Sequence, residues 1–216
     1  MSHQIAASTT MAVVAPDINS NLAPSADNTM TLFRQFGFGD KTRIPFGTVH
    51  EAFIHHATQA PSEVALVDLS PGTPKEVTYG ELLRQSQFIA TQLRANGVIP
   101  GHRVMLLMKR SAEMVAGILG ILMAGAQYIP MDGGVVPDHT LQHAVEQSSV
   151  TVVLCLHPFE ERIRFLGTAG VSILVLDDLL QSPAFTDFAV EPTSLLCEGN
   201  KNSGCYLIYT SGELNS

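Results

Sequence analysis

The sequence has no tryptophan and few charged residues, which make up only 15% of its 216 residues. An ordinary soluble domain has about 25%, so the chain has little polar cover and part of its surface is expected to be buried against something else. Its 12 Lys and Arg against 20 Asp and Glu give a net charge of −8, and the basic residues form no cluster. This balance argues against nucleic acid or a membrane surface as the main partner.

Long apolar runs, a secretory signal and a cysteine framework are also missing. The longest uncharged apolar stretch, residues 114–126, is too short to span a hydrocarbon core of about 30 Å and predicts a buried helix. Residues 1–32 lack the basic start and apolar segment of a signal peptide. We expect them to form a disordered leader before a domain at 33–216. The odd number of cysteines, without metal-like spacing, predicts reduced thiols in a cytoplasmic protein; they are Cys155, Cys197 and Cys205.

Two capping-box motifs in the sequence predict the starts of two helices. Thr48 is followed three residues later by Glu51, and Thr78 by Glu81. In this pattern the Thr hydroxyl and the Glu carboxylate satisfy the first unpaired N–H groups of a helix. We predict one helix from Thr48 to about residue 59 and another from Thr78 to a glycine cap at Gly97.

The remainder of the chain alternates between short apolar strands and helical patterns. Predicted strands cover 64–68, 104–108, 127–130, 151–155, 171–176 and 206–209, and further helices cover 112–124, 138–147 and 159–166. Residues 181–204 lack periodicity and are predicted to be a long surface connection. This alternation predicts an α/β fold with a mostly parallel sheet and flanking helices.

Three segments, in order, resemble the adenylation domains of nonribosomal peptide synthetases, members of the adenylate-forming, AMP-binding family. They are Val77 to Leu82, Leu122 to Asp132 and Tyr206 to Gly212. Each alone is weakly specific, whereas three in this order and spacing are a strong signal. The likeness runs from about residue 33 to 212. It implies the first subdomain of an adenylation domain, incomplete because the chain is cut within the phosphate-binding loop.

The resemblance implies that Thr210, Ser211 and Gly212 begin a phosphate loop. In the family the loop continues with Ser or Thr, Thr, Gly, any residue, Pro, Lys and Gly, whose hydroxyl, N–H and ammonium groups stabilise the phosphates of ATP. This chain instead has Glu213, followed by Leu and Asn. A carboxylate there repels phosphate by about 1–4 kcal/mol, depending on the dielectric. We therefore expect a vestigial loop, no catalytic residues, and no bound ATP or Mg²⁺, although the family uses both.

Two histidine pairs invite a metal-binding interpretation. His55 and His56 are adjacent, and His139 and His143 have the i, i+4 spacing of a helix face. The sequence supplies no third ligand for either pair, so solvated surface histidines are the simpler interpretation and no metal site is expected.

These observations support several hypotheses about function. The leading one is a truncated synthetase-like protein of fungal secondary metabolism, derived from an ATP-dependent amino-acid-activating ligase domain and inactive alone. The second is an interaction or complementing module that docks on a full synthetase or a complementing chain. The third is a misannotated fragment of an active adenylating enzyme. In each case uncovered sheet edges predict marginal stability and a tendency to aggregate.

Overall fold

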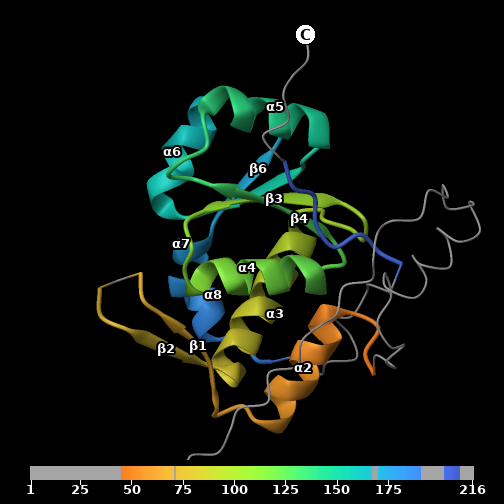
Figure 1. Cartoon of the computed structure of the whole chain (residues 1–216), viewed down its shortest axis with the longest axis vertical. Coiled ribbons are helices and arrows are strands. Elements are labelled where there is room, and N and C mark those ends of the chain that lie inside the picture. Colours follow the sequence, from red (N-terminus) through yellow and green to blue (C-terminus); the bar gives the residue numbers. More distant parts are fainter. Residues whose placement is uncertain (1–44, 71, 167–169, 191–201, 210–216) are drawn as a thin grey trace, which may run out of the picture. The chain divides into compact units, whose positions relative to one another are not determined.

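A parallel four-stranded sheet organises the computed structural model, which describes residues 45–70, 72–166, 170–190 and 202–209 (Figure 1). The strand order is β4-β3-β5-β6, and each neighbouring pair is parallel. The predicted α/β class with a mostly parallel sheet is therefore confirmed. Its strands are β3 (Arg103–Met108), β4 (Gln127–Asp132), β5 (Val152–Cys155) and β6 (Ser172–Val175).

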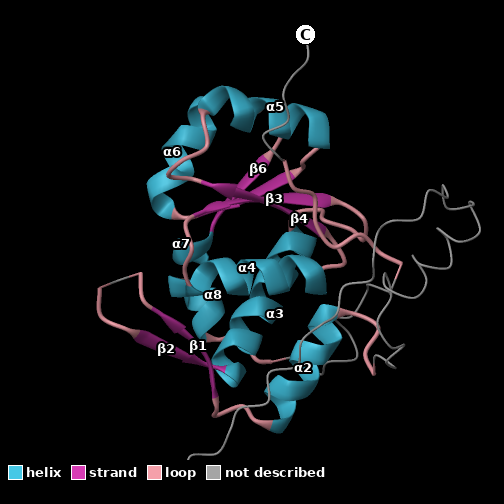
Figure 2. Ribbon diagram, viewed as in Figure 1, coloured by secondary structure: helices cyan, strands magenta, loops and turns pink. Residues whose placement is uncertain are grey.

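Helices cover both faces of this sheet (Figure 2). On one face lie α5 (Asp138–Ser148) and α6 (His157–Phe165), and on the other lie α4 (Ala112–Met123) and, beyond it, α3 (Tyr79–Ala95). Side chains of β3 alternate between the two cores: Met105 and Leu107 belong to the α5/α6 side, whereas Leu106 belongs to the α3/α4 side. A strand that is buried on both faces explains the continuous apolar run of β3.

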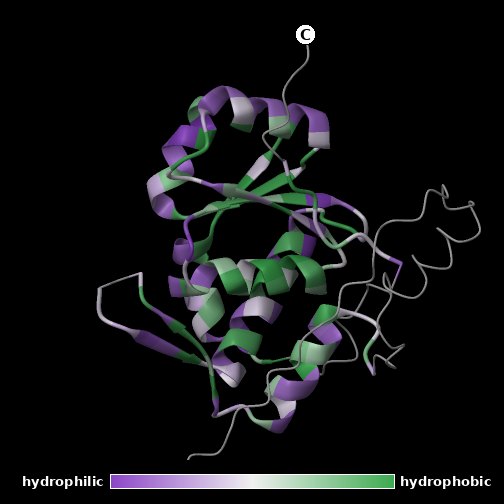
Figure 3. Cartoon of the chain, in the orientation of Figure 1, coloured by the Kyte–Doolittle hydropathy of each residue, from purple (hydrophilic) through white to green (hydrophobic). Residues whose placement is uncertain are grey.

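Helix α4 is mostly apolar, apart from Glu113 in its first turn, because it lies between the sheet and α3 (Figure 3). Two glycines allow the close approach. A Cβ added at Gly117 would lie 2.8 Å from Leu106 of the sheet, and one at Gly120 would lie 2.6 Å from Ile89 of α3. The predicted buried helix in the longest apolar stretch is thus confirmed. None of the described helices has both the length and the apolar character needed to cross a membrane.

Both predicted capping boxes are present. Thr48 caps α2 (Val49–Gln59) by accepting from the Glu51 N–H, while the Glu51 carboxylate accepts from the Thr48 N–H. Thr78 and Glu81 form the same pair of bonds at the start of α3. Beyond α3 the chain turns through Gly97, whose φ of 80° is left-handed as the predicted glycine cap requires.

A β-hairpin next to α3 was only half predicted. β1 (Val64–Asp68) was expected, but its antiparallel partner β2 (Lys75–Thr78) was not. Only Val77 of β2 is well buried, so the segment has no apolar alternation to reveal it. The hairpin forms a separate two-stranded sheet, and Asp68 links it to α4 by accepting the Ala112 N–H at 2.8 Å.

Two predictions near the carboxyl end of the chain need correction. Part of the expected surface connection is helical, because α8 (Pro183–Thr186) lies within it; a further helix that was not predicted, α7 (Leu176–Gln181), follows β6 directly. Arg84 of α3 holds this segment by donating to the carbonyls of Phe185 and Phe188, and its guanidinium lies 4.2 Å from the Phe185 ring centre. The strand expected at 206–209 is reduced to a single bridge between Tyr206 and β4.

Candidate functional site

The carboxyl ends of the four parallel strands form the candidate site. In open α/β sheets ligands bind beyond these ends, where the loops that follow the strands meet. Here the loops after β3 and β4 begin at Lys109 and Gly133, and those after β5 and β6 lead at once into α6 and α7. The candidate site is therefore surrounded by four segments far apart in the sequence.

The segment 202–209 runs beside β4 and extends the sheet at that edge. The Tyr128 N–H donates to the Cys205 carbonyl at 3.2 Å, and the Leu207 N–H donates to the Tyr128 carbonyl at 3.0 Å. The bridge between Tyr128 and Tyr206 is parallel. The segment therefore heads toward the same end of the sheet as β4, which is the carboxyl end.

Side chains of this segment alternate between core and solvent. Leu207 and Tyr209 pack against the core on the α5 side, and the Tyr209 hydroxyl donates to the Ala144 carbonyl at 3.3 Å. Tyr206 and Ile208 are more than half exposed. The alternation is that of a strand with one buried face, even though only one bridge is formed. Thr210, Ser211 and Gly212, the expected phosphate-loop residues, follow directly and lie outside the described residues.

Arg162 of α6 fixes the loop that follows β4. Its guanidinium donates to the Gly133 carbonyl at 2.8 Å, to the Val136 carbonyl, and to the Asp138 carboxylate at 2.6 Å. These contacts also fasten the start of α5, because Asp138 is its first residue. Nothing in the local sequence reveals these partners, which lie 24 to 29 positions away from Arg162.

A cavity of about 800 Å³ lies at the opposite, amino end of β4. Its walls come from the start of α2, the end of α4 and residues 203–205, including Phe46, Leu122 and Gly125. The cavity lies before β4 and the segment beside it, at the end of the sheet opposite to that toward which residues 205–209 run. His50 in its wall is buried, its Nε2 has no hydrogen-bond partner among the described residues, and burial lowers the pKa of this imidazole below its usual value.

The histidines that the sequence singled out are all exposed. His55 and His56 pack their rings near Phe46, and His139 and His143 lie on the outer side of α5. Within the described residues, three other side chains lie close enough together to be potential metal ligands: His157, Glu160 and Asp178. The sequence reasoning missed it, although a His and a Glu three positions apart at the start of a helix are a readable signal.

Comparison with known proteins identifies the family of this chain. Residues 53–212 match the AMP-binding enzyme family. The chain belongs to that family. It is 40% identical over 185 residues, or 86% of its length, to adenylate-forming reductase 06235 of Coprinopsis cinerea, and 32% identical over 76% of its length to one of the mycosubtilin synthase proteins of Bacillus subtilis. The sequence resemblance to adenylation domains is therefore confirmed.

Solved structures of adenylate-forming proteins share the fold. The nonribosomal peptide synthetase FmoA3, bound to α-methyl-L-serine-AMP, superimposes on 87% of the chain with a TM-score of 0.68 and 26% identity. The matched region corresponds to the N-terminal subdomain of adenylate-forming enzymes. FmoA3 has also been seen with AMPPNP, so members of the AMP-binding family bind both ATP analogues and adenylates.

The chain spans only a small part of these relatives. It covers 17% of the Coprinopsis reductase, 6% of the mycosubtilin synthase protein and 20% of FmoA3. Similarity over so small a part of these longer proteins does not by itself give this chain their activity.

Of the two cysteines that the structure describes, Cys155 is unsuited to a reactive site. Cys155 at the end of β5 is fully buried, and burial raises the pKa of its thiol to about 12. A thiol that stays protonated is a poor nucleophile and a poor metal ligand. Cys205 is half-buried beside β4, and both of these cysteines are reduced. Cys197 lies outside the described residues.

Proposed function

We propose that this chain is the N-terminal portion of a carboxylic-acid-activating adenylation domain, of the amino-acid-activating kind used in secondary metabolism, and that it does not form adenylates on its own. It would act in the cytoplasm, where ATP is available. One observation carries the proposal: residues 205–209 run parallel to β4 toward the carboxyl end of the sheet, directly before Thr210, Ser211 and Gly212.

The chemistry of a phosphate loop at that position supports the ancestry. Hydroxyl and backbone N–H groups placed beyond the carboxyl end of a strand can surround phosphate oxygens while a carboxylate attacks the α-phosphorus and pyrophosphate leaves. Thr210, Ser211 and Gly212 would supply the first of these groups. The neighbouring loop after β4, fixed by Arg162, would form one wall of the site.

The next residues support the absence of activity. Glu213 would set a carboxylate against the ATP phosphates, Leu214 offers no hydroxyl, and Asn215 replaces a glycine whose bare backbone lets phosphate approach closely. Repulsion between two such charges is worth about 1–4 kcal/mol, from the dielectric of bulk water to that near a protein surface. We therefore propose that the 216-residue chain alone binds neither ATP nor Mg²⁺ productively.

Amino-acid-dependent exchange of pyrophosphate into ATP tests this proposal. Incubated with each amino acid in turn and with a panel of other carboxylic acids, the purified chain should give exchange no higher than buffer. A clear substrate-dependent signal from the chain alone would refute the proposal.

A pair of chimeras separates the loop from the rest of the subdomain. In the first, residues 45–212 replace the matching part of the Coprinopsis reductase, whose own loop then follows. In the second, residues 45–215 are transferred, so that Glu213, Leu214 and Asn215 are included. We expect exchange from the first chimera and a loss of more than about tenfold in the second, which corresponds to about 1.4 kcal/mol. Equal activity would show that the altered loop is harmless.

A second candidate function is a complementing module that docks on a synthetase or on a separately encoded remainder of the domain. The observation favouring it is the exposed apolar pair Tyr206 and Ile208 on the segment at the sheet edge. Co-purification from the native host discriminates between the two functions, because a docking module should bring down a synthetase in stoichiometric amount and an isolated remnant should not.

Sequencing the transcript beyond the codon for Gly212 tests the third hypothesis, that the chain is a misannotated fragment of an active adenylating enzyme whose reading frame was misread.

A further inference from the structure

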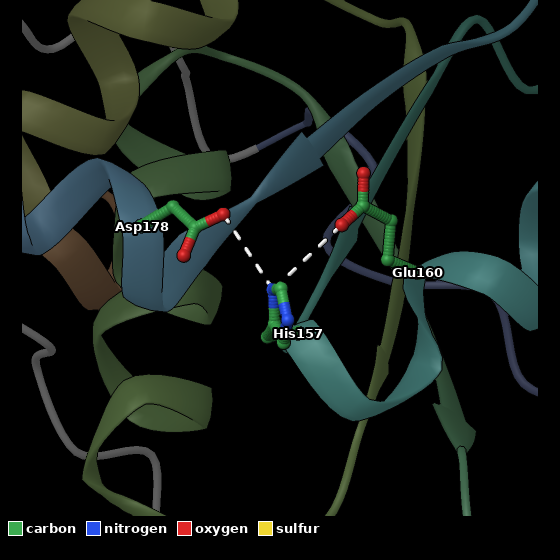
Figure 4. A group of neighbouring side chains, drawn as sticks. All are labelled: His157, Glu160 and Asp178. Atoms are coloured by element: carbon green, nitrogen blue, oxygen red, sulfur yellow. Dashed lines mark ion pairs between the residues drawn. The ribbon is translucent and has the colours of Figure 1, made fainter.

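We propose that His157, Glu160 and Asp178 form a binding site for a divalent transition metal, Zn²⁺ in particular, which joins the start of α6 to the start of α7. The three side chains come from two helices and point toward one another across the gap between them (Figure 4). The site is independent of the proposed adenylation ancestry, because none of these residues belongs to the phosphate loop.

The separations between ligand atoms fit a small tetrahedral ion. His157 Nδ1 lies 3.7 Å from Glu160 Oε2 and 3.7 Å from Asp178 Oδ2, and all three atoms lie within 4.8 Å of one another. Bonds of about 2.0–2.2 Å in a tetrahedron place ligand atoms roughly 3.3–3.6 Å apart. The two nearer pairs must close by a few tenths of an ångström, and the Glu160 and Asp178 oxygens, which lie within 4.8 Å, by up to about 1.5 Å, for all three ligands to reach bonding distance, with a fourth position open to water.

Neighbouring contacts already hold two of the three ligands in place. Arg164 donates twice to Glu160 Oε1, at 2.6 and 2.9 Å, which leaves Oε2 to face the imidazole. The Asp177 carboxylate accepts the backbone N–H of His157 at 2.9 and 3.2 Å. Such outer-shell contacts orient metal ligands and reduce the conformational freedom lost on binding.

Charge at this position also favours a cation. Three carboxylates, those of Glu160, Asp177 and Asp178, are arranged around His157, and Arg164 neutralises only one of them. The donor set of one nitrogen and two oxygens suits Zn²⁺ or Co²⁺ better than Ca²⁺ or Mg²⁺, which select oxygen ligands alone. A bound ion would tie the β5–α6 connection to the β6–α7 connection at the carboxyl end of the sheet.

Zinc titration of the whole chain, made without a histidine tag, tests the site. The protein used for the titration, called the parent below, should carry His139→Ala and His143→Ala, because that exposed i, i+4 pair can bind zinc itself. We expect saturable binding of one Zn²⁺ by calorimetry, a rise in the melting temperature with Zn²⁺, and a tetrahedral Co²⁺ absorption spectrum that Zn²⁺ abolishes.

Two single substitutions assign the ligands. His157→Ala and Asp178→Asn change exposed side chains, so both variants should fold, which circular dichroism verifies. Each should weaken Zn²⁺ binding by at least about tenfold, since even the loss of an outer-shell partner costs about 10–100-fold. The proposal fails if both variants bind Zn²⁺ within twofold of the parent, or if the parent binds none.

Discussion

At the scale of single residues, His50 is the buried group whose titration should be visible in stability. The residue is 4% exposed, Nε2 has no hydrogen-bond partner within the described part of the chain, and burial lowers the pKa of the imidazole below the usual 6.5. In the unfolded chain the imidazole takes up a proton near pH 6.5. Below that pH the unfolded state binds more protons than the folded state, so stability falls as the pH decreases.

We therefore predict a lower free energy of unfolding at pH 5.5 than at pH 7.5, by up to about 1.4 kcal/mol for each pH unit in which only the unfolded form is protonated. Urea unfolding at both pH values measures it. His50→Leu should reduce the difference, whereas His143→Leu, at an exposed position, should leave it unchanged. An equal pH dependence in wild type and His50→Leu would contradict the assignment.

Asp68 should contribute to stability in a more acidic pH range, and in the same direction as His50. It is 9% exposed and accepts N–H bonds from Ser70 and Ala112, each 2.8 Å long. A hydrogen bond from the Ser70 side chain, more than any other contact, lowers the pKa of its carboxyl group, and the two backbone N–H groups add to this effect. The stabilisation is therefore present above the unfolded pKa of about 3.9 and is lost as the pH falls through the lower folded value.

At neutral pH we predict that Asp68→Ala lowers the free energy of unfolding by about 1.5–3 kcal/mol, the range for hydrogen bonds to a charged group. Asp187→Ala, at an exposed site, is the matched control and should change it by less than about 0.5 kcal/mol. Denaturant unfolding compares the two. Similar losses in both variants would mean that the link from β1 to α4 is unimportant.

At the scale of elements, the approach of α4 to α3 depends on Gly120. A Cβ there would meet the β-branched Ile89 at 2.6 Å and the Ser86 carbonyl oxygen at 3.0 Å, whereas one at Gly117 meets chiefly the flexible end of Leu106 at 2.8 Å. Overpacking costs about 1–3 kcal/mol, and replacing glycine in a helix by alanine returns up to about 1 kcal/mol.

We predict that Gly120→Ala lowers the melting temperature clearly and that Gly117→Ala has a small effect of either sign, because Leu106 can change rotamer. Thermal unfolding followed by circular dichroism checks both variants side by side. If Gly120→Ala proves as stable as wild type, the helices can separate more easily than their packing indicates.

Local signals explain which elements the sequence could predict. The caps at Thr48 and Thr78 and the apolar run of β3 depend on residues within one turn or one strand, and the structure contains all of them. β2 and α7 were missed because their stability comes from elsewhere: β2 pairs with β1, and α7 begins with Leu176, which is buried against the core of α3 and α4. Such support comes from tertiary packing, which overrides weak local preference.

At the scale of the whole molecule, the same reasoning limits what could be predicted of the candidate site. The order of three short motifs was enough to identify the AMP-binding family, because the order and spacing of motifs can be read from the sequence without knowing the fold. The grouping of His157 with Asp178, and of Arg162 with the loop after β4, depends on parallel strands bringing distant loops to one edge. No local pattern encodes that proximity.

The exposed side chain of Ile208, on the segment beside β4, leads to a prediction about the chain in solution. Ile208 is 56% exposed on a segment that pairs with β4 on one side, and an apolar segment at a sheet edge is a template for association. We expect the purified chain to self-associate as its concentration rises, measured by light scattering after gel filtration. Ile208→Lys should reduce this association, because a lysine at an edge opposes strand pairing. Val135→Lys, which changes a residue that is 78% exposed in a loop, adds the same charge without altering the edge and should have little effect. A monomer that melts cooperatively at every concentration would show instead that the edge is adequately protected.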